Sequence, residues 1–160
     1  MVAMRSVLIA DDSETLRGFY RKLFTDSGWR VLEAKNGQEA VQVADEFSPN
    51  VVVLDISMPV MDGIRAARIL LNKKPEVHVV LCSLYATDEG INLEAYLEGV
   101  DRVLMKSDAC RYLVSIAEKL VAGGFEGTPY GDGSFALANG EKNRSDQLSG
   151  ERVTPTLRLQ

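Results

Sequence analysis

Short apolar runs alternate with amphipathic segments over the first 122 residues of the chain. The runs are rich in β-branched residues and bounded by polar ones, which is typical of β-strands. Strands are therefore predicted at Ser6–Ala10, Arg30–Glu33, Val51–Leu54, Val77–Cys82 and Arg102–Met105. The segments between and after them carry apolar residues at helical spacing and predict helices at 13–27, about 40–47, 64–71, about 88–98 and 111–121. Ser13 is the expected N-cap of the first helix, and Gly28 marks its end.

The alternation of strands and helices predicts an α/β domain with a parallel sheet, because parallel strands need crossover connections, which are usually helices. The run Val51–Leu54 is apolar at every position, which indicates a strand buried on both faces. We therefore expect a doubly wound, five-stranded parallel sheet with helices on both faces. In open α/β sheets the ligand site lies beyond the carboxyl ends of the strands, so the residues after each strand are the candidates for chemistry.

The composition divides the chain into two parts. Residues 123–160 contain seven of the 13 glycines and show no sustained hydrophobic period. A segment of this kind buries too little apolar surface to offset the entropy lost on ordering it. We therefore predict a domain over residues 1–122 and a disordered tail or truncated linker over residues 123–160.

Charge and cysteine content narrow the class of protein. The 160 residues carry 18 Lys+Arg and 23 Asp+Glu, and this net charge of −5 disfavours a nucleic-acid surface. Cys82 and Cys110 are too few for a disulfide framework, so a reducing compartment is expected. No apolar run approaches the roughly 20 residues of a membrane helix, and the first ten residues make no convincing signal peptide. We expect a soluble cytoplasmic protein with no membrane partner.

Chemically active side chains follow four of the predicted strands. Asp11 and Asp12 follow the first, Asp55 the third, Ser83 the fourth and Lys106 the fifth. In the predicted sheet they converge at one edge, where three carboxylates together are costly unless a cation neutralises them. All the acidic ligands are hard oxygens, which suits Mg²⁺ rather than zinc.

A magnesium ion beside a free carboxylate and a lysine is an arrangement for phosphoryl transfer. In such a site the carboxylate attacks phosphorus. The metal and the ammonium hold the phosphoryl oxygens, and the hydroxyl forms a hydrogen bond to the product.

The ordered set of motifs resembles one family. The stretches and residues that carry the resemblance are Asp11-Asp12, Asp55-Ile-Ser-Met-Pro-Val-Met-Asp-Gly63, Ser83 and Lys106, with Lys35-Asn36-Gly37-Gln38-Glu39-Ala40 before a helix. Over roughly residues 5–122, they are similar to the receiver domain of bacterial two-component response regulators. The resemblance implies a flavodoxin-like sheet in the order 2-1-3-4-5.

The resemblance also implies roles for individual residues. Asp55 would be the phosphoacceptor, and Lys106 would contact the phosphoryl group. Ser83 would be the hydroxyl that signals the presence of the phosphate. The expected Mg²⁺ ligands are Asp11, Asp12, Asp55 and the backbone carbonyl of Ser57.

Three positions depart from the family pattern. Val103 stands where the family often has an aromatic switch residue, which weakens the expected coupling to Ser83. Ser107 replaces a common proline, and Lys106-Ser107-Asp108 is similar to the branch with helix-turn-helix output domains. Leu84 is bulky where the family usually has a small residue, and we expect it to alter the access of water to an aspartyl phosphate.

The leading hypothesis is a phosphorylation-dependent switch. A histidine kinase, a phosphotransfer protein or a small phosphodonor would supply the phosphoryl group, and an unidentified output protein would read the result. The chain would be an acceptor that assists its own phosphorylation, not a turnover enzyme.

Two alternatives remain at this stage. The first is a transcriptional regulator without its DNA-binding domain. No recognition helix follows residue 122, and residues 123–160 hold four Lys+Arg against five Asp+Glu, so direct nucleic-acid binding is not expected. The second is an aspartyl phosphatase, although adjacent aspartates replace the DxD spacing of that class and nothing resembles its cap domain.

Overall fold

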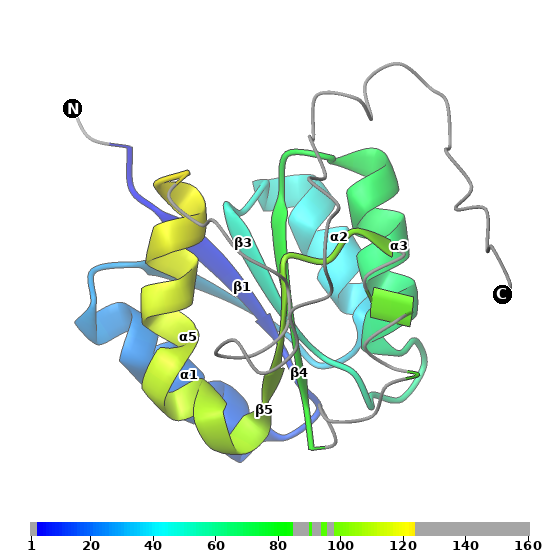
Figure 1. Ribbon diagram of the computed structural model, residues 1–160, viewed down its shortest axis with the longest axis horizontal. Helices are drawn as coiled ribbons and strands as arrows, with labels where there is room; N and C mark the ends of the chain where they lie inside the picture. Colours follow the sequence, from blue (N-terminus) through cyan, green and yellow to red (C-terminus); the bar gives the residue numbers. More distant parts are fainter. Residues whose placement is uncertain (1–2, 85–89, 91–93, 96–97, 124–160) are drawn as a thin grey trace, which may run out of the picture.

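Five parallel strands form the centre of the protein (Figure 1). The computed structural model describes residues 3–84, 90, 94–95 and 98–123. The strands are β1 (Ser6–Ala10), β2 (Arg30–Ala34), β3 (Val51–Asp55), β4 (His78–Ser83) and β5 (Arg102–Met105). They pair in the order β2-β1-β3-β4-β5, which confirms the expected doubly wound, flavodoxin-like sheet.

Four helices of the described residues cover the two faces of this sheet. They are α1 (Glu14–Asp26), α2 (Gly37–Phe47), α3 (Gly63–Lys73) and α5 (Lys106–Val121). In Figure 1, α1 and α5 lie on one face and α2 and α3 on the other. The helix predicted at about 88–98 falls mostly outside the described residues, as does the tail predicted at 123–160.

The last helix begins earlier than its hydrophobic pattern indicates. It was expected to begin at Arg111, but α5 begins at Lys106, directly after β5. The only buried side chain in its first five residues is Ala109, which is too small to mark a helical period. Its N-cap position is Met105, which makes no side-chain cap. Lys106 therefore stands in the first helical turn, at the edge of the sheet.

The other three helices begin at side-chain caps. Ser13 accepts from the backbone N–H of Leu16 at 3.3 Å, as the sequence indicated. Asn36 caps α2 and Asp62 caps α3, each by accepting a backbone N–H three residues ahead. Such caps satisfy amide groups that have no partner inside the helix. They set where the chain turns from each strand into the next helix.

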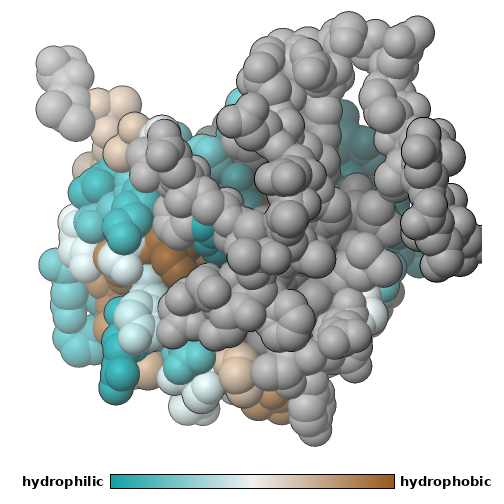
Figure 2. All heavy atoms as spheres, in the orientation of Figure 1, coloured by the Kyte–Doolittle hydropathy of each residue, from teal (hydrophilic) through white to brown (hydrophobic). Residues whose placement is uncertain are grey.

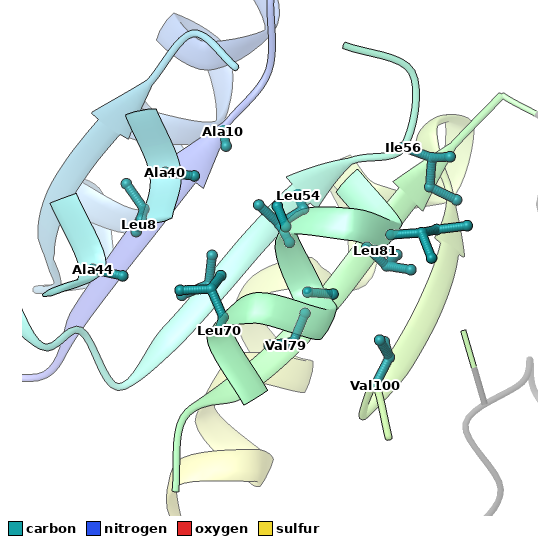
Figure 3. Close-up of a cluster of buried hydrophobic side chains, with 14 of the residues drawn as sticks. Leu8, Ala10, Ala40, Ala44, Leu54, Ile56, Leu70, Val79, Leu81 and Val100 are labelled. Carbon is teal, nitrogen blue, oxygen red and sulfur yellow. The ribbon is translucent and has the colours of Figure 1, made fainter. Parts of the chain in front are cut away.

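The core consists of two apolar layers, one on each face of the sheet. Side chains alternate along the strands, so a continuous apolar run supplies both layers. One layer, between the sheet and α2 and α3, is shown in part in Figure 3, where Leu8, Leu54 and Leu81 of the strands lie near Ala40 and Leu70 of the helices. The other layer contains Val7, Ile9, Val51, Val53, Val80 and Cys82 from the strands, with side chains of α1 and α5.

Where described residues are visible in Figure 2, hydrophilic side chains predominate, with some hydrophobic ones between them. Among the described residues, no helix is long and apolar enough to cross a membrane. In an open parallel sheet such as this one, ligands bind beyond the carboxyl ends of the strands, so a site is sought there.

Candidate functional site

The ends of four strands bring the predicted site residues to one edge of the sheet. Asp11 follows β1, Asp55 is the last residue of β3, and Ser83 is the last residue of β4. Lys106 follows β5. The pairing register aligns these ends, since Asp55 pairs with Cys82 and Ser83 pairs with Met105.

The three acidic residues form one cluster. One carboxylate oxygen each of Asp11, Asp12 and Asp55 lie within 4.8 Å of one another. The side chains of Asp11 and Asp55 are only 2% and 4% exposed, whereas Asp12 is exposed. The cluster therefore has a buried floor and an open side from which a ligand can approach.

Lys106 supplies positive charge to the buried part of the cluster. Its Nζ lies 3.0 Å from Oδ2 of Asp11 and 3.2 Å from Oδ2 of Asp55. One ammonium thus faces two carboxylates, with a third nearby. The described side chains leave an excess of negative charge, which a cation would neutralise.

Burial raises the pKa of Asp55 above its usual value, and the charge of Asp11 raises it further. The contacts with Lys106 and with the N–H of Ser57 oppose this rise without cancelling it. For Lys106, burial works to lower the pKa, but the contacts with Asp11 and Asp55 outweigh it and leave the pKa raised. The lysine is therefore charged at neutral pH.

The loop after β3 holds Asp55 in place through its backbone. The N–H of Ser57 donates to Oδ1 of Asp55 at 3.2 Å. The N–H of Gly63 donates to the carbonyl of Ile56 at 2.9 Å, and a Cβ at Gly63 would collide with the backbone of Asp55. The Asp-Gly pair that ends the motif therefore allows a close approach that only glycine permits.

The cysteine beside the site has an unreactive thiol. Cys82 is buried in β4, and burial raises the pKa of its thiol to about 12. A thiol that stays protonated at neutral pH is a poor nucleophile. Cys82 therefore serves as a small apolar residue of the core.

The three departures from the family pattern have different surroundings. Val103 is buried in the layer beneath α2 and α3, and Ser107 is exposed in the first turn of α5. Leu84 directly follows Ser83 and is 66% exposed. Their effects on switching and on dephosphorylation stay predictions, as does the Ser57 carbonyl as a metal ligand.

Sequence reasoning missed Arg17, which touches the site from α1. Its side chain is only 8% exposed and shares the buried face of α1 with Tyr20 and Phe24. Nη1 of Arg17 donates to the backbone carbonyl of Asp11 at 2.7 Å. The sequence did carry a signal for its burial, because Arg17 lies three positions before Tyr20 and seven before Phe24, on the same helical face as these two aromatic residues.

The donor set fits a magnesium ion. Carboxylate oxygens are the ligands that Mg²⁺ prefers, and the three oxygens already lie close together. The exposed Asp12 leaves the cluster open toward solvent, which suits an ion that keeps several waters. Among the described residues, this is the one group of three or more acidic, histidine or cysteine side chains close enough to share an ion.

Comparison with known proteins points to one family. The sequence model of the response regulator receiver domain matches residues 7–118. The chain is 34% identical over 117 residues to the chemotaxis protein CheY of Listeria monocytogenes, covering 72% of this chain and 98% of that protein. It is 40% identical over 117 residues to a protein-glutamate methylesterase/protein-glutamine glutaminase of Archaeoglobus fulgidus, which covers 72% of this chain. It spans only 34% of the length of that enzyme.

A solved structure shares the fold and part of the sequence. The response regulator protein TrrA of Thermotoga maritima, described in complex with Mg(2+)-BeF, superposes with a TM-score of 0.67 at 26% identity. The match covers 73% of this chain and 99% of that one.

Proposed function

This chain belongs to the response regulator receiver domain family of two-component systems, and from that premise we propose that it is a phosphorylation-dependent switch with Asp55 as the phosphoacceptor. Receiver domains of this family interact with kinases and with output partners. The observation that supports the proposal is the buried Asp55 carboxylate, which lies 3.2 Å from Lys106 and beside the carboxylates of Asp11 and Asp12.

Asp55 acts as the nucleophile. An oxygen of its ionised carboxylate attacks the phosphorus of the donor and forms a new O–P bond. The bond from phosphorus to the donor atom breaks, and the leaving group keeps its electron pair. Nζ of Lys106 lies 3.2 Å from Oδ2 of Asp55, where its positive charge offsets the negative charge brought by the phosphoryl oxygens.

Asp11, Asp12 and Asp55 would hold Mg²⁺, together with the backbone carbonyl of Ser57. A bound Mg²⁺ would supply positive charge that lets phosphoryl oxygens approach a carboxylate cluster. Lys106 alone cannot supply enough positive charge, because its single ammonium already contacts two carboxylates. The Mg(2+)-BeF complex of TrrA supports this assignment for a protein of similar sequence and fold.

Phosphorylation adds charge and hydrogen-bond acceptors at the sheet edge, and these bias the neighbouring loops. Ser83 lies at the end of β4, between the strands that carry Asp55 and Lys106. Its hydroxyl donates to a phosphoryl oxygen in the phosphorylated state and so links the phosphate to the residues that follow β4. The exposed Leu84 is the first of these residues.

A histidine kinase or a phosphotransfer protein is the donor, and an output protein reads the changed surface. The chain is an acceptor that assists its own phosphorylation rather than a turnover enzyme. Membership of the receiver family argues against the phosphatase alternative. The alternative of a regulator separated from its DNA-binding domain concerns the output, not the acceptor chemistry.

The test is phosphorylation by acetyl phosphate with Mg²⁺, read as a mass gain of one phosphoryl group. The wild-type chain is compared with Asp55→Asn and with Asp62→Asn. Asp62 is a matched control, because it is an exposed aspartate in the same loop and asparagine is an equally good N-cap. We expect wild type and Asp62→Asn to gain the group and Asp55→Asn to gain none. Equal gain in all three proteins would refute Asp55 as the acceptor.

A further inference from the structure

A buried cation on α1 needs a reason, because a charge removed from water is costly unless it is paired. Arg17 is 8% exposed, and its guanidinium has two described partners. Nη1 donates to the backbone carbonyl of Asp11 at 2.7 Å, and Nε lies 3.6 Å from Oε1 of Glu33 on β2.

The ion pair with Glu33 does not by itself explain the burial. Arg21, one turn later on α1, also pairs with Glu33, at 2.8 Å, while its own side chain is exposed. A surface arginine can therefore reach this carboxylate. The contact that the buried position adds is the one with the carbonyl of Asp11.

That carbonyl belongs to the peptide group that joins Asp11 to Asp12. A peptide group is planar, so the direction of its carbonyl sets the direction in which the chain continues. The last ladder pair of β1 and β2 is Ala10 with Ala34, and the carbonyl of Asp11 lies beyond it. The N–H of Asp11 is held by the carbonyl of Ala34 at 3.2 Å, and Arg17 holds the other side of the residue.

We propose that Arg17 is a positioning residue that sets the angle between Asp11 and Asp12 for cation binding. The inference rests on the proposed function, because it assumes that the acidic cluster binds Mg²⁺. Arg17 touches neither the phosphoryl group nor a carboxylate of the cluster in the contacts described. It acts through the peptide group that carries one carboxylate on each side. Removing a partner that orients a metal ligand weakens metal affinity by about 10- to 100-fold.

The experiment measures Mg²⁺ affinity without any phosphodonor, by following backbone amide resonances of the full chain during titration. Arg17→Met removes the donors but keeps an apolar stem in the core. Arg17→Lys restores one charged donor. Arg21→Met is the matched control, because it removes the other arginine that pairs with Glu33 and leaves the contact between Arg17 and Asp11 in place.

We expect Arg17→Met to raise the Mg²⁺ dissociation constant about tenfold, at the lower end of that range. Arg17→Lys should recover part of the loss, and Arg21→Met should stay within about twofold of wild type. The rate of phosphorylation by acetyl phosphate should then need more Mg²⁺ for half-saturation in Arg17→Met but reach a similar maximum. A merely structural role would lower that maximum without moving the Mg²⁺ requirement.

Equal Mg²⁺ affinity in Arg17→Met and Arg21→Met would overturn the inference and leave the proposed function intact. Absence of Mg²⁺ binding in the wild-type chain would instead refute the metal site itself. If Arg17→Met does not fold, Arg17→Gln takes its place. The Mg²⁺ dissociation constant should again rise, and the maximal rate of phosphorylation should again stay similar. The shorter amide of glutamine keeps no charge and cannot hold both Asp11 and Glu33.

Discussion

Asp55 has an environment that makes its ionisation costly to the fold. Its carboxylate is buried beside Asp11, and both share the ammonium of Lys106. Burial and the neighbouring negative charge raise the pKa of Asp55, so ionising it costs free energy in the folded state. Because the proposed reaction needs an ionised Asp55, the fold bears this cost at neutral pH.

The sign of this effect predicts the stability of Asp55→Asn. A carboxyl whose pKa is higher in the folded than in the unfolded state destabilises the fold increasingly as the pH rises from the unfolded to the folded pKa. Above the folded pKa the full cost applies. The cost disappears as the pH falls below the unfolded pKa. We therefore expect Asp55→Asn to melt at a higher temperature than wild type at pH 7, because the neutral amide avoids the cost of ionising a buried carboxyl. The difference should shrink as the pH is lowered.

Thermal unfolding of both proteins between pH 7 and pH 4 measures this difference. Asp62→Asn, the exposed neighbour, should show little difference from wild type over the same range. A lower melting temperature for Asp55→Asn at pH 7 would mean that the contacts of the carboxylate outweigh its burial.

At the scale of elements, α2 and α3 are joined by a lysine that acts as a helix cap. Nζ of Lys74 donates to the carbonyl of Ala44 at 2.7 Å and to Oγ of Ser48 at 2.6 Å, at the end of α2. Carbonyls at a helix C-terminus have no partner inside the helix and carry partial negative charge. The lysine therefore ties the end of α3 to the end of α2.

Lys74→Met is expected to destabilise the fold by about 1–2 kcal/mol, because the three hydrogen bonds that its ammonium donates at the end of α2 are lost, the third being to the carbonyl of Asp45 at 3.3 Å. The matched control is Lys73→Met, which breaks only the exposed ion pair of Lys73 with Asp45. Such surface pairs contribute about 0–1 kcal/mol. Urea unfolding of the two variants compares them directly, and equal losses would show that the cap adds nothing.

Gly63 links the start of α3 to Asp55 at the end of β3. Because a Cβ there would collide with the backbone of Asp55, Gly63→Ala must displace either the helix or Asp55. We expect the free energy of unfolding to fall by about 1–3 kcal/mol, the range typical of overpacked sites, together with slower phosphorylation.

Gly18→Ala is the control for this substitution. Gly18 lies within α1, where an added Cβ would meet only the side chain of Arg21 at ordinary contact distance. Alanine there should stabilise the helix by about 1 kcal/mol. Chemical denaturation with a phosphorylation assay distinguishes the two glycines, and a neutral Gly63→Ala would contradict the steric argument.

At the scale of the molecule, charge sets how the fold responds to cations. The chain has a net charge of −5, and three of its carboxylates gather at one edge of the sheet. An ion that binds only the folded state stabilises it by mass action. Stability should therefore depend on Mg²⁺ through a local site and not only through general screening.

We expect Mg²⁺ at ten times its dissociation constant to stabilise the wild-type chain by about 1.4 kcal/mol over a sodium chloride control of equal ionic strength. Asp12→Asn should lose most of this gain, because Asp12 is the exposed carboxylate of the cluster. Asp26→Asn, at the far end of α1, should keep it. Melting curves with Mg²⁺ and with a chelator measure the gain, and equal responses of the two variants would contradict a local site.

The sequence by itself determined the elements and the chemical groups at the strand ends. Strand and helix patterns are local, so the five strands and the cap at Ser13 could be predicted directly. The position of Asp55 at the end of an apolar run is equally local. The order of the strands was different, because it came from the resemblance to the receiver family and was then confirmed by the observed pairing.

Only the tertiary structure decided the contacts between distant residues. Lys106 and Asp11 are 95 positions apart, and their distance of 3.0 Å depends on the sheet register and on α5 beginning directly after β5. Arg17 lies on the buried face of α1, but a hydrophobic period does not say which backbone atom a buried charge will meet. The close approach of Gly63 to the backbone of Asp55 also results from tertiary packing. Local patterns specify which groups are present, and three-dimensional packing determines which of them touch.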